Sequence, residues 1–167
     1  MKVCSGAQTG VDQAALAVAH DLEWETGGYI PTGALTLDGP RHDLVKKYGL
    51  TEFGVGYKPR TGKNVETANF TLRIFSAKNS PGEICTLNWI NIHKKPYYDI
   101  DLNTYRTYNY FRKKSLIHAV VARLYWYCQK DGVLNVAGNS EKTSPGIYQE
   151  AYDILNEVFL TYATETN

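Results

Sequence analysis

The sequence predicts an α/β fold whose mostly parallel sheet is covered by helices on both faces. Two observations indicate this fold. Strand-like and helix-like segments alternate along the chain, and the strand-like segments are continuously apolar instead of switching between apolar and polar residues. Continuously apolar strands are typical of a sheet that is buried on both faces. The chain has 167 residues, which suits one domain, and we expect residues 1–167 to form it.

The first half of the chain is expected to begin with a strand at residues 2–5, which stops at Gly6. Residues 11–22 predict a helix because their apolar residues recur at steps of three and four. Thr9, with Asp12 three residues later, resembles a capping box at the start of this helix. A short extended piece, a polar loop at 36–43, one or two helical turns at 43–48 and a short helix at 60–70 follow.

The second half of the chain repeats the strand-helix order. A strand at 71–76 precedes a helix that begins at about Glu83, and a further strand is expected at 96–102. Residues 109–130 give the longest helix signal, and "KDG" at 130–132 is typical of a helix end. A buried strand at 133–138 ends in Gly138, and Pro145 is expected to open the last helix.

Composition excludes several classes of protein. The net charge of +1 supplies no overall field that would attract nucleic acid or an anionic membrane, so we expect neither as a partner. The three cysteines are widely spaced, which predicts buried free thiols instead of a disulfide framework or a metal clip. No apolar run of about 18 residues predicts a membrane span, and the N-terminus does not resemble a signal peptide. We therefore expect a cytoplasmic protein.

The stretch "CSGAQTGVDQAAL" at residues 4–16 is the first candidate binding segment. It lies at a strand-helix junction, where glycines let the backbone approach a ligand and the first helical amides favour an anion. It matches neither standard nucleotide-binding fingerprint. Two interpretations stay open: a phosphate-binding loop, or a tight turn in which Asp12 only caps the helix.

Two further loops follow strands in the same way: "SPGEICT" at 80–86 and "NVAGNSEKTSPGIY" at 135–148. A parallel sheet would bring all three loops to one rim, where ligands of such folds bind. The last loop offers hydrogen-bonding groups from Asn135, Ser140, Glu141 and Ser144, although it could be an ordinary surface loop. In residues 57–69, Arg60, Lys63 and Asn64 could close over a phosphate or form a solvated face.

No catalytic constellation stands out. The four histidines have no paired spacing, no serine lies in a GxSxG motif, and no cysteine-histidine pairing can be identified. Glu83 and Glu141 are the acidic residues expected near the rim apart from Asp12. These patterns predict neither a metal site nor a catalytic residue.

The motifs, in order, resemble the putative molybdenum carrier family of the SLOG group. "SGAQTGVDQAAL" closely resembles the family's "GGQTGVDRAAL", and "LNVAGNSEKTSPGIY" resembles "LNVAGPRES" followed by "PGIY". The segments "TGGYIPTG", "LDG", "YGLTE", "RTGKNV" and "KKPYYDIDL" also have counterparts. The resemblance covers the whole chain, and the ordered set is specific although each motif alone is not.

This resemblance implies a Rossmann-like domain that holds a phosphorylated nucleotide-like or molybdopterin-like ligand at its rim without transforming it. It also implies a homo-oligomer, either a dimer or a tetramer. From the motifs and the three strand-end loops together, the expected ligand-binding residues are Gly6, Ala7, Gln8, Thr9, Gly10, Asp12, Arg60, Thr61, Asn64, Pro81, Gly82, Thr86, Gly138, Asn139, Ser140, Glu141 and Gly146.

This chain departs from the family pattern at several positions. Ala7 replaces a glycine, Gln13 replaces an arginine, and Asn139-Ser140 stand where the family has Pro-Arg. We therefore expect a retained binding scaffold with a changed ligand preference.

Other members of the SLOG group suggest further functions. One is sequestration of a nucleotide-derived immune signal, such as a cyclic ADP-ribose variant. Another is a phosphoribohydrolase acting on nucleoside monophosphates. The chain keeps Pro81, Gly82 and Thr86 of that enzyme's pattern but lacks the glutamate expected after Thr86. The 13 tyrosines leave a protein-interaction module as a third alternative.

Overall fold

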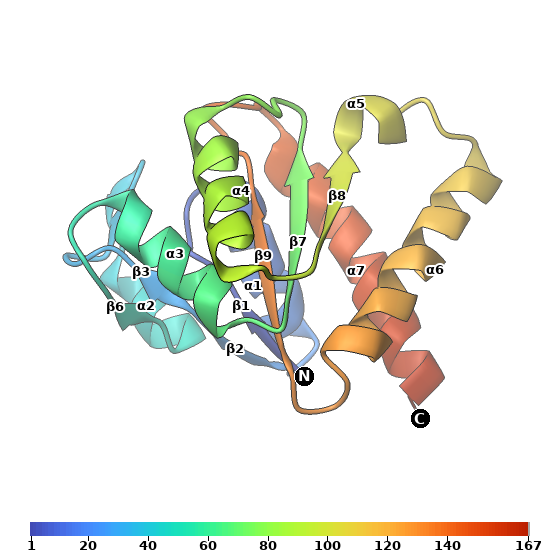
Figure 1. The fold of residues 1–167 in the computed structure, drawn as a ribbon, viewed down its shortest axis with the longest axis horizontal. Helices are drawn as coiled ribbons and strands as arrows, with labels where there is room; N and C mark the ends of the chain where they lie inside the picture. Colours follow the sequence, from blue (N-terminus) through green and yellow to red (C-terminus); the bar gives the residue numbers. More distant parts are fainter. Residues whose placement is uncertain (167) are drawn as a thin grey trace.

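The computed structural model describes residues 1–166, and within them five strands form a central parallel sheet (Figure 1). Every neighbouring pair in this sheet is parallel, which confirms the predicted α/β architecture. In spatial order the strands are β2 (Glu25–Gly27), β1 (Lys2–Cys4), β9 (Val133–Gly138), β7 (Phe70–Phe75) and β8 (Tyr97–Asp101). Asn167, the last residue of the predicted domain, lies outside the described residues.

Helices cover both faces of the sheet, as predicted. On one face, α1 (Val11–Asp21) and α6 (Tyr110–Tyr127) both pack against α7 (Ile147–Thr166). On the opposite face, α3 (Tyr57–Thr67) packs against α4 (Pro81–His93). In Figure 1, α3 and α4 lie in front of the sheet and α1 lies behind it.

The two faces of the sheet differ in chemistry. Side chains alternate along a strand, and in β7 Phe70, Leu72 and Ile74 join the apolar core formed with α1, α6 and α7. Thr71 and Arg73 point to the other face and are also fully buried, so polar groups lie between the sheet and α4. This polar layer leads toward the carboxyl ends of the strands.

The order of the strands explains why three loops meet. The chain places its last strand, β9, between β1 and β7. The segments after β1, β9 and β7 therefore leave adjacent strands at the same edge of the sheet. In a fold of this kind, that edge is where ligands bind.

Several predicted elements are corrected in detail. The polar loop at 36–43 contains part of a small antiparallel hairpin, β4 (Leu35–Thr36) with β5 (Gly39–Pro40). The two-residue strands β3 (Tyr29–Ile30) and β6 (Thr51–Glu52) pair in parallel beside the main sheet. The helix α2 (His42–Tyr48) confirms the one or two helical turns predicted at 43–48. A short helix, α5 (Leu102–Tyr105), was not predicted.

Two predictions about helix starts are wrong. The Thr9 hydroxyl is buried and makes no hydrogen bond within residues 1–166, so Thr9 does not cap α1. Gly10 is the residue before α1, and the Asp12 carboxylate instead accepts a hydrogen bond from the Gln8 amide. The last helix begins at Ile147, two residues after Pro145.

None of the helices across residues 1–166 combines the length and apolar character that a membrane crossing requires.

Candidate functional site

A cavity of about 870 Å³ lies at the carboxyl edge of the sheet, between α3, α4 and the loops after β1 and β9. This volume is within the range of about 300–1,000 Å³ that is typical of small-molecule sites. Its lining contains polar and apolar groups from segments far apart in the sequence, and we call it the main cavity. The segments that contribute to it are residues 6–12, 37, 55–64, 80–86 and 135–143.

The first loop depends on two glycines that allow close approaches. A Cβ at Gly6 would lie 1.5 Å from Nη1 of Arg60, so the guanidinium rests directly against the backbone there. Gly10 has a φ of 88°, and a Cβ would lie 2.5 Å from the Asn139 carbonyl oxygen. The Val11 amide donates to this same oxygen at 3.2 Å. These contacts hold the first loop against Arg60 and against the loop after β9.

Arg60 and Asp12 form a buried ion pair at the edge of the main cavity. Nη1 of Arg60 lies 3.3 Å from Oδ2 of Asp12, and their side chains are 11% and 5% exposed. Burial raises the pKa of Asp12, while the nearby Arg60 charge opposes the rise. Nε of Arg60 has no hydrogen-bond partner among the described residues.

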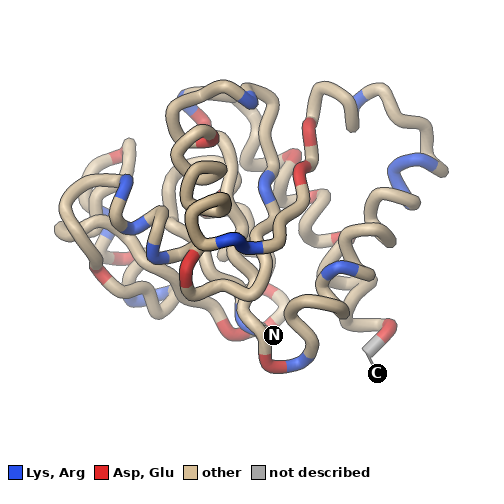
Figure 2. Tube along the Cα trace, viewed as in Figure 1, with Lys and Arg blue, Asp and Glu red and all other residues tan. Residues whose placement is uncertain are grey.

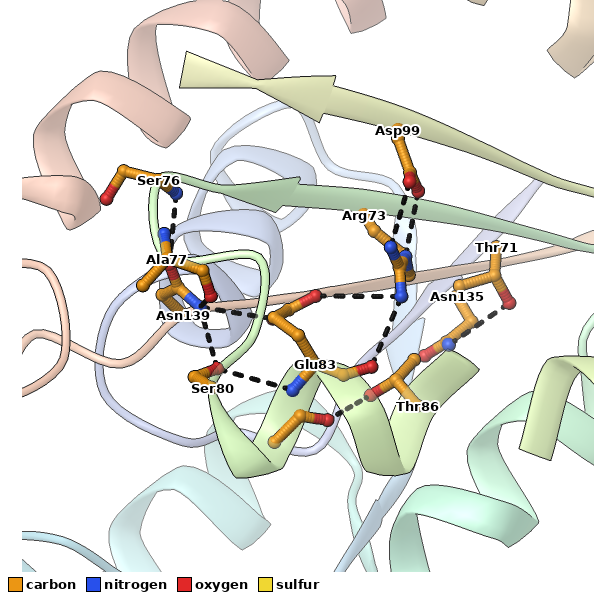
Figure 3. A network of polar contacts seen from close by, with 11 residues as sticks. Thr71, Arg73, Ser76, Ala77, Ser80, Glu83, Thr86, Asp99, Asn135 and Asn139 are labelled. Carbon is orange, nitrogen blue, oxygen red and sulfur yellow. Dashed lines mark hydrogen bonds and ion pairs between the residues drawn. The ribbon is translucent and has the colours of Figure 1, made fainter. Parts of the chain in front are cut away.

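A second buried network lies between β7, β8 and α4 (Figure 3). Arg73 donates two hydrogen bonds of 2.8 Å to the Asp99 carboxylate and a third to the Glu83 backbone carbonyl. Glu83 is almost completely buried, and its Oε2 lies 4.0 Å from Arg73 without a hydrogen bond in the described chain. Because Asp99 already neutralises Arg73, burial dominates at Glu83 and raises its pKa to about 8.

Asn139 joins the loops after β7 and β9. Its Oδ1 accepts hydrogen bonds from the backbone amides of Ser76 and Ala77 and from the Ser144 hydroxyl. Its Nδ2 lies within 3.4 Å of three acceptors, on Ala77, Ser80 and Glu83. Figure 3 shows this side chain between the two loops. Asn139 therefore has a clear structural role, which the sequence pattern alone did not indicate.

The structure brings most of the predicted binding residues to one place. Those that line the main cavity are Gly6, Gln8, Asp12, Arg60, Thr61, Asn64, Pro81, Gly82, Thr86, Gly138, Asn139 and Ser140. The predicted residues that do not line it are Ala7, Thr9, Gly10, Glu141 and Gly146.

The positions of two of these five residues, Ala7 and Glu141, show what they do instead. Ala7, at a φ of 55°, packs in an apolar cluster with Leu16 and Ile30, so its methyl group does not enter the main cavity. Glu141 accepts hydrogen bonds from the amides of Gly146 and Tyr148 and so caps the start of α7.

Asn64 lines the main cavity, but its amide group is already engaged. Its Oδ1 accepts from the Tyr29 amide at 2.8 Å, and its Nδ2 donates to the Tyr29 carbonyl at 2.9 Å. This pair of bonds fastens α3 to β3. Lys63, which we considered beside Asn64 as a phosphate ligand, pairs with Glu66 instead and does not line the cavity.

Sequence reasoning missed one wall of the cavity and two of its cations. Lys58 and Lys142 both line it, and neither forms a salt bridge within residues 1–166. The wall around Val55 and Tyr57 was also missed, as was Leu37, which lines the cavity from the turn between β4 and β5. A charged residue beside an expected rim loop was the only available signal, and it does not distinguish a ligand contact from a solvated lysine.

The cysteines are free, and two of the three are buried as predicted. Cys85 is the exception, because it is only half-buried and lines the main cavity. Burial raises the pKa of its thiol, although Arg60 and Lys58 oppose the rise. Within the described part of the chain, no group of three or more metal-ligating side chains gathers.

Comparison with known proteins agrees with this architecture. A family model described as the circularly permutated YpsA SLOG family matches residues 3–159. The chain belongs to this SLOG family. That assignment confirms the resemblance to the SLOG group that the motifs indicated.

A solved structure is similar to this chain over nearly its whole length. The chain is similar to a crystal structure named "putative molybdenum carrier protein", from Syntrophus aciditrophicus SB, with a TM-score of 0.77 and 33% sequence identity. The match covers 95% of this chain and 94% of that chain. A comparison with curated proteins gave no match. The Rossmann-like arrangement of this SLOG protein is therefore shared with a solved relative.

Proposed function

We propose that this SLOG protein binds a phosphorylated small molecule with a planar ring, such as a nucleotide or a pterin, and retains it unchanged. The observation that carries this proposal is the main cavity, where cationic and apolar walls face a common space at the strand ends. Cations suit a phosphate, and an apolar wall suits a ring. The remaining support comes from each wall in turn.

The cationic wall consists of Arg60, Lys58 and Lys142, which come from α3 and the loop after β9. Asp12 is the one carboxylate that lines the main cavity in residues 1–166. Positive groups therefore outnumber negative ones locally, even though the chain as a whole has a net charge of +1. Figure 2 shows acidic and basic residues interspersed along the trace.

The apolar wall contains residues that are unusually exposed for their type. Val55 is 91% exposed and Tyr57 is 43% exposed, and both line the main cavity. An aromatic ring and an aliphatic side chain at the mouth of a cavity can stack against a planar ligand. A bound ring would remove this apolar surface from water, which favours binding.

The positions of the carboxylates favour binding without chemical change over hydrolysis. The Glu83 side chain, from the first turn of α4, is buried, and the Glu141 side chain caps α7. Neither residue lines the main cavity. The third candidate, Asp12, is paired with Arg60. The role we favour is that of a carrier or a sequestering protein, and a pterin phosphate and a cyclic ADP-ribose variant are the two ligand types to compare.

A binding panel tests the proposal. The panel comprises AMP, cyclic ADP-ribose isomers and molybdopterin, with melting temperature and calorimetry as readouts. We expect at least one compound to raise the melting temperature, because a ligand that binds only the folded state stabilises it. Mass spectrometry should recover that compound with its mass unchanged. Binding of none of them, or release of a free base, would contradict the proposal.

Lysine variants connect binding to the cavity. Lys58→Ala with Lys142→Ala should weaken binding of a phosphorylated ligand, because a hydrogen bond to a charged group contributes about 1.5–3 kcal/mol. One such bond corresponds to a loss of about ten- to 100-fold in affinity. Lys63→Ala is the matched control, since Lys63 belongs to the same helix but pairs with Glu66 outside the cavity. An equal effect of both changes would argue against the assigned site.

A further inference from the structure

We propose that Asp12 is a built-in competitor that occupies the anion site of Arg60 until a ligand's anionic group takes its place. This inference rests on the proposed function, because it concerns how the same cavity accepts a phosphate. It assigns Asp12 a role opposite to the ligand contact that the motif suggested.

The geometry of the ion pair shows that Arg60 is poorly satisfied. Its one contact with Asp12, at 3.3 Å, is longer than the 2.7–2.9 Å typical of a charge-assisted hydrogen bond. By comparison, Arg41, Arg73 and Arg106 each donate two hydrogen bonds of 3.0 Å or less to one carboxylate.

The unused donor on Arg60 is a second, independent observation. The residue is 91% buried, since 9% is exposed, and its Nε has no partner among residues 1–166. A buried guanidinium nitrogen without an acceptor is costly, because it has lost its water and gained nothing in exchange. A phosphate has enough oxygens to satisfy two edges of a guanidinium, which one distant carboxylate oxygen does not.

The buried position of Asp12 is unfavourable for its charged form. Burial raises the pKa of Asp12 and so disfavours the charged form, while Arg60, the Gln8 amide and the Ser5 side chain oppose the rise. Glu83 from α4 is close enough for the Asp12 charge to affect its pKa. Arg60, whose Nε has no partner in the described chain, would gain from a rearrangement in which a ligand anion faces it.

The first loop explains why an external anion must compete at this point. At a helix N-terminus, a free ligand would normally bind the backbone amides. Here the Gln8 amide is bonded to Asp12, and the Thr9 amide to the Gln8 side chain. The Val11 amide is bonded to Asn139. With these three donors already used, Arg60 is the buried donor with an unsatisfied nitrogen that an arriving anion can recruit, beside Lys58 and Lys142.

Asp12→Asn tests the inference with inorganic phosphate and AMP as probes. Asparagine keeps an oxygen for the Gln8 amide but removes the competing charge, so we expect phosphate and AMP to bind at least about tenfold more tightly than to the wild type. The variant should be less stable without ligand, because Arg60 loses its counter-charge. Phosphate should raise its melting temperature by more than it raises that of the wild type.

Three controls make the test specific. Asp21→Asn removes the same charge from the other end of α1, where Asp21 contacts Tyr152, and should leave affinity unchanged. Adding Arg60→Gln to Asp12→Asn should abolish the gain. If Asp12→Asn does not fold, Asp12→Ser gives the same comparison, since a serine hydroxyl can also accept from the Gln8 amide.

The outcomes separate this inference from the proposed function. If the wild type binds a compound of the panel but Asp12→Asn binds phosphate and AMP no more tightly, the competitor role is wrong and the binding function stands. If nothing in the panel binds the wild type while Asp12→Asn gains phosphate binding, the competitor role stands and the proposed function is wrong.

Discussion

Two glycines with the same φ differ in how closely other atoms approach them. Gly10 and Gly39 both have a φ of 88°, but only Gly10 lies against another segment, at the Asn139 carbonyl. A Cβ at Gly39 would meet nothing within 4 Å. The difference between the two sites includes the close approach between the first loop and the loop after β9.

We predict that Gly39→Ala costs about 1–2 kcal/mol, the penalty for a left-handed residue with a side chain. Gly10→Ala should cost about 1–3 kcal/mol more, because the neighbouring atom is backbone and cannot rotate away. Chemical denaturation of both variants measures the difference. Equal free energies of unfolding would show that the two loops do not approach as closely as described.

The buried carboxyl of Glu83 predicts a pH dependence of stability. Its pKa is about 8 in the folded protein against 4.5 for an exposed glutamate. The folded state thus keeps a proton that the unfolded chain has lost, so this group's contribution is fully present below pH 4.5 and is lost as pH rises to about 8. We expect Glu83→Gln to remove the part of the loss of stability at rising pH that this carboxyl causes.

Melting curves between pH 5 and pH 8.5 test this prediction, with Glu150→Gln as the control because Glu150 pairs with Arg106 at the surface. The difference in stability between Glu83→Gln and the wild type should grow with pH, whereas the control should follow the wild type. Parallel curves for all three proteins would contradict a protonated Glu83.

Some site residues could be predicted from sequence and others could not, for a physical reason. Gly6 and Asp12 were found because a short motif at a strand end has a recognisable chemistry, and Arg60 because arginine suits a phosphate. Lys58 and Lys142 are single surface-type residues, and only the folded chain shows that they face one cavity. The structural roles of Asn64 and Asn139 depend on partners 35 and 62 or 63 residues away, which no local pattern reveals.

At the scale of elements, helix α7 shows how a predicted ligand residue can have another use. Both carboxylate oxygens of Glu141 accept backbone amides at its start, at 2.7 and 2.9 Å. We predict that Glu141→Ala destabilises the protein by about 0.5–2 kcal/mol, as loss of a helix cap does. Ligand affinity should change little, because Glu141 does not line the main cavity.

Thermal unfolding and calorimetry of the same variant test both parts. Glu150→Ala removes the same charge from α7 but breaks only a surface ion pair, worth about 0–1 kcal/mol. A large loss of affinity in Glu141→Ala without a loss of stability would show that Glu141 contacts the ligand, and would contradict this prediction.

The long elements were predictable because their periodicity extends over many residues. Strand β9 occupies the predicted residues, and α1 and α4 differ from prediction by one or two residues at the ends that were predicted. The hairpin of β4 and β5 was missed because two-residue strands carry no periodic signal. The tyrosine-rich segment 97–111 forms β8, α5 and the start of α6, and it does not line the main cavity.

At the scale of the whole molecule, the resemblance to the family predicts a homo-oligomer. Sedimentation analysis should give a mass of two or four times the 18.8 kDa chain. The mass of a single chain at micromolar concentration would contradict this prediction.

The central claim is that the main cavity retains a phosphorylated ring compound, and Gly82 offers a way to block it. Gly82 lines the cavity, and a Cβ there would meet nothing within 4 Å, so Gly82→Trp should fill space without disturbing the fold. Ile84→Trp is the control, since Ile84 is exposed on the same helix outside the cavity.

The most direct measurement is mass spectrometry of the small molecules released when freshly purified protein is denatured. The account predicts a phosphate-containing heterocyclic compound in near-equal amount to the chain, present in the wild type and Ile84→Trp and absent from Gly82→Trp. A wild-type protein that releases no such compound, or a Gly82→Trp variant that releases as much as the wild type, would contradict it.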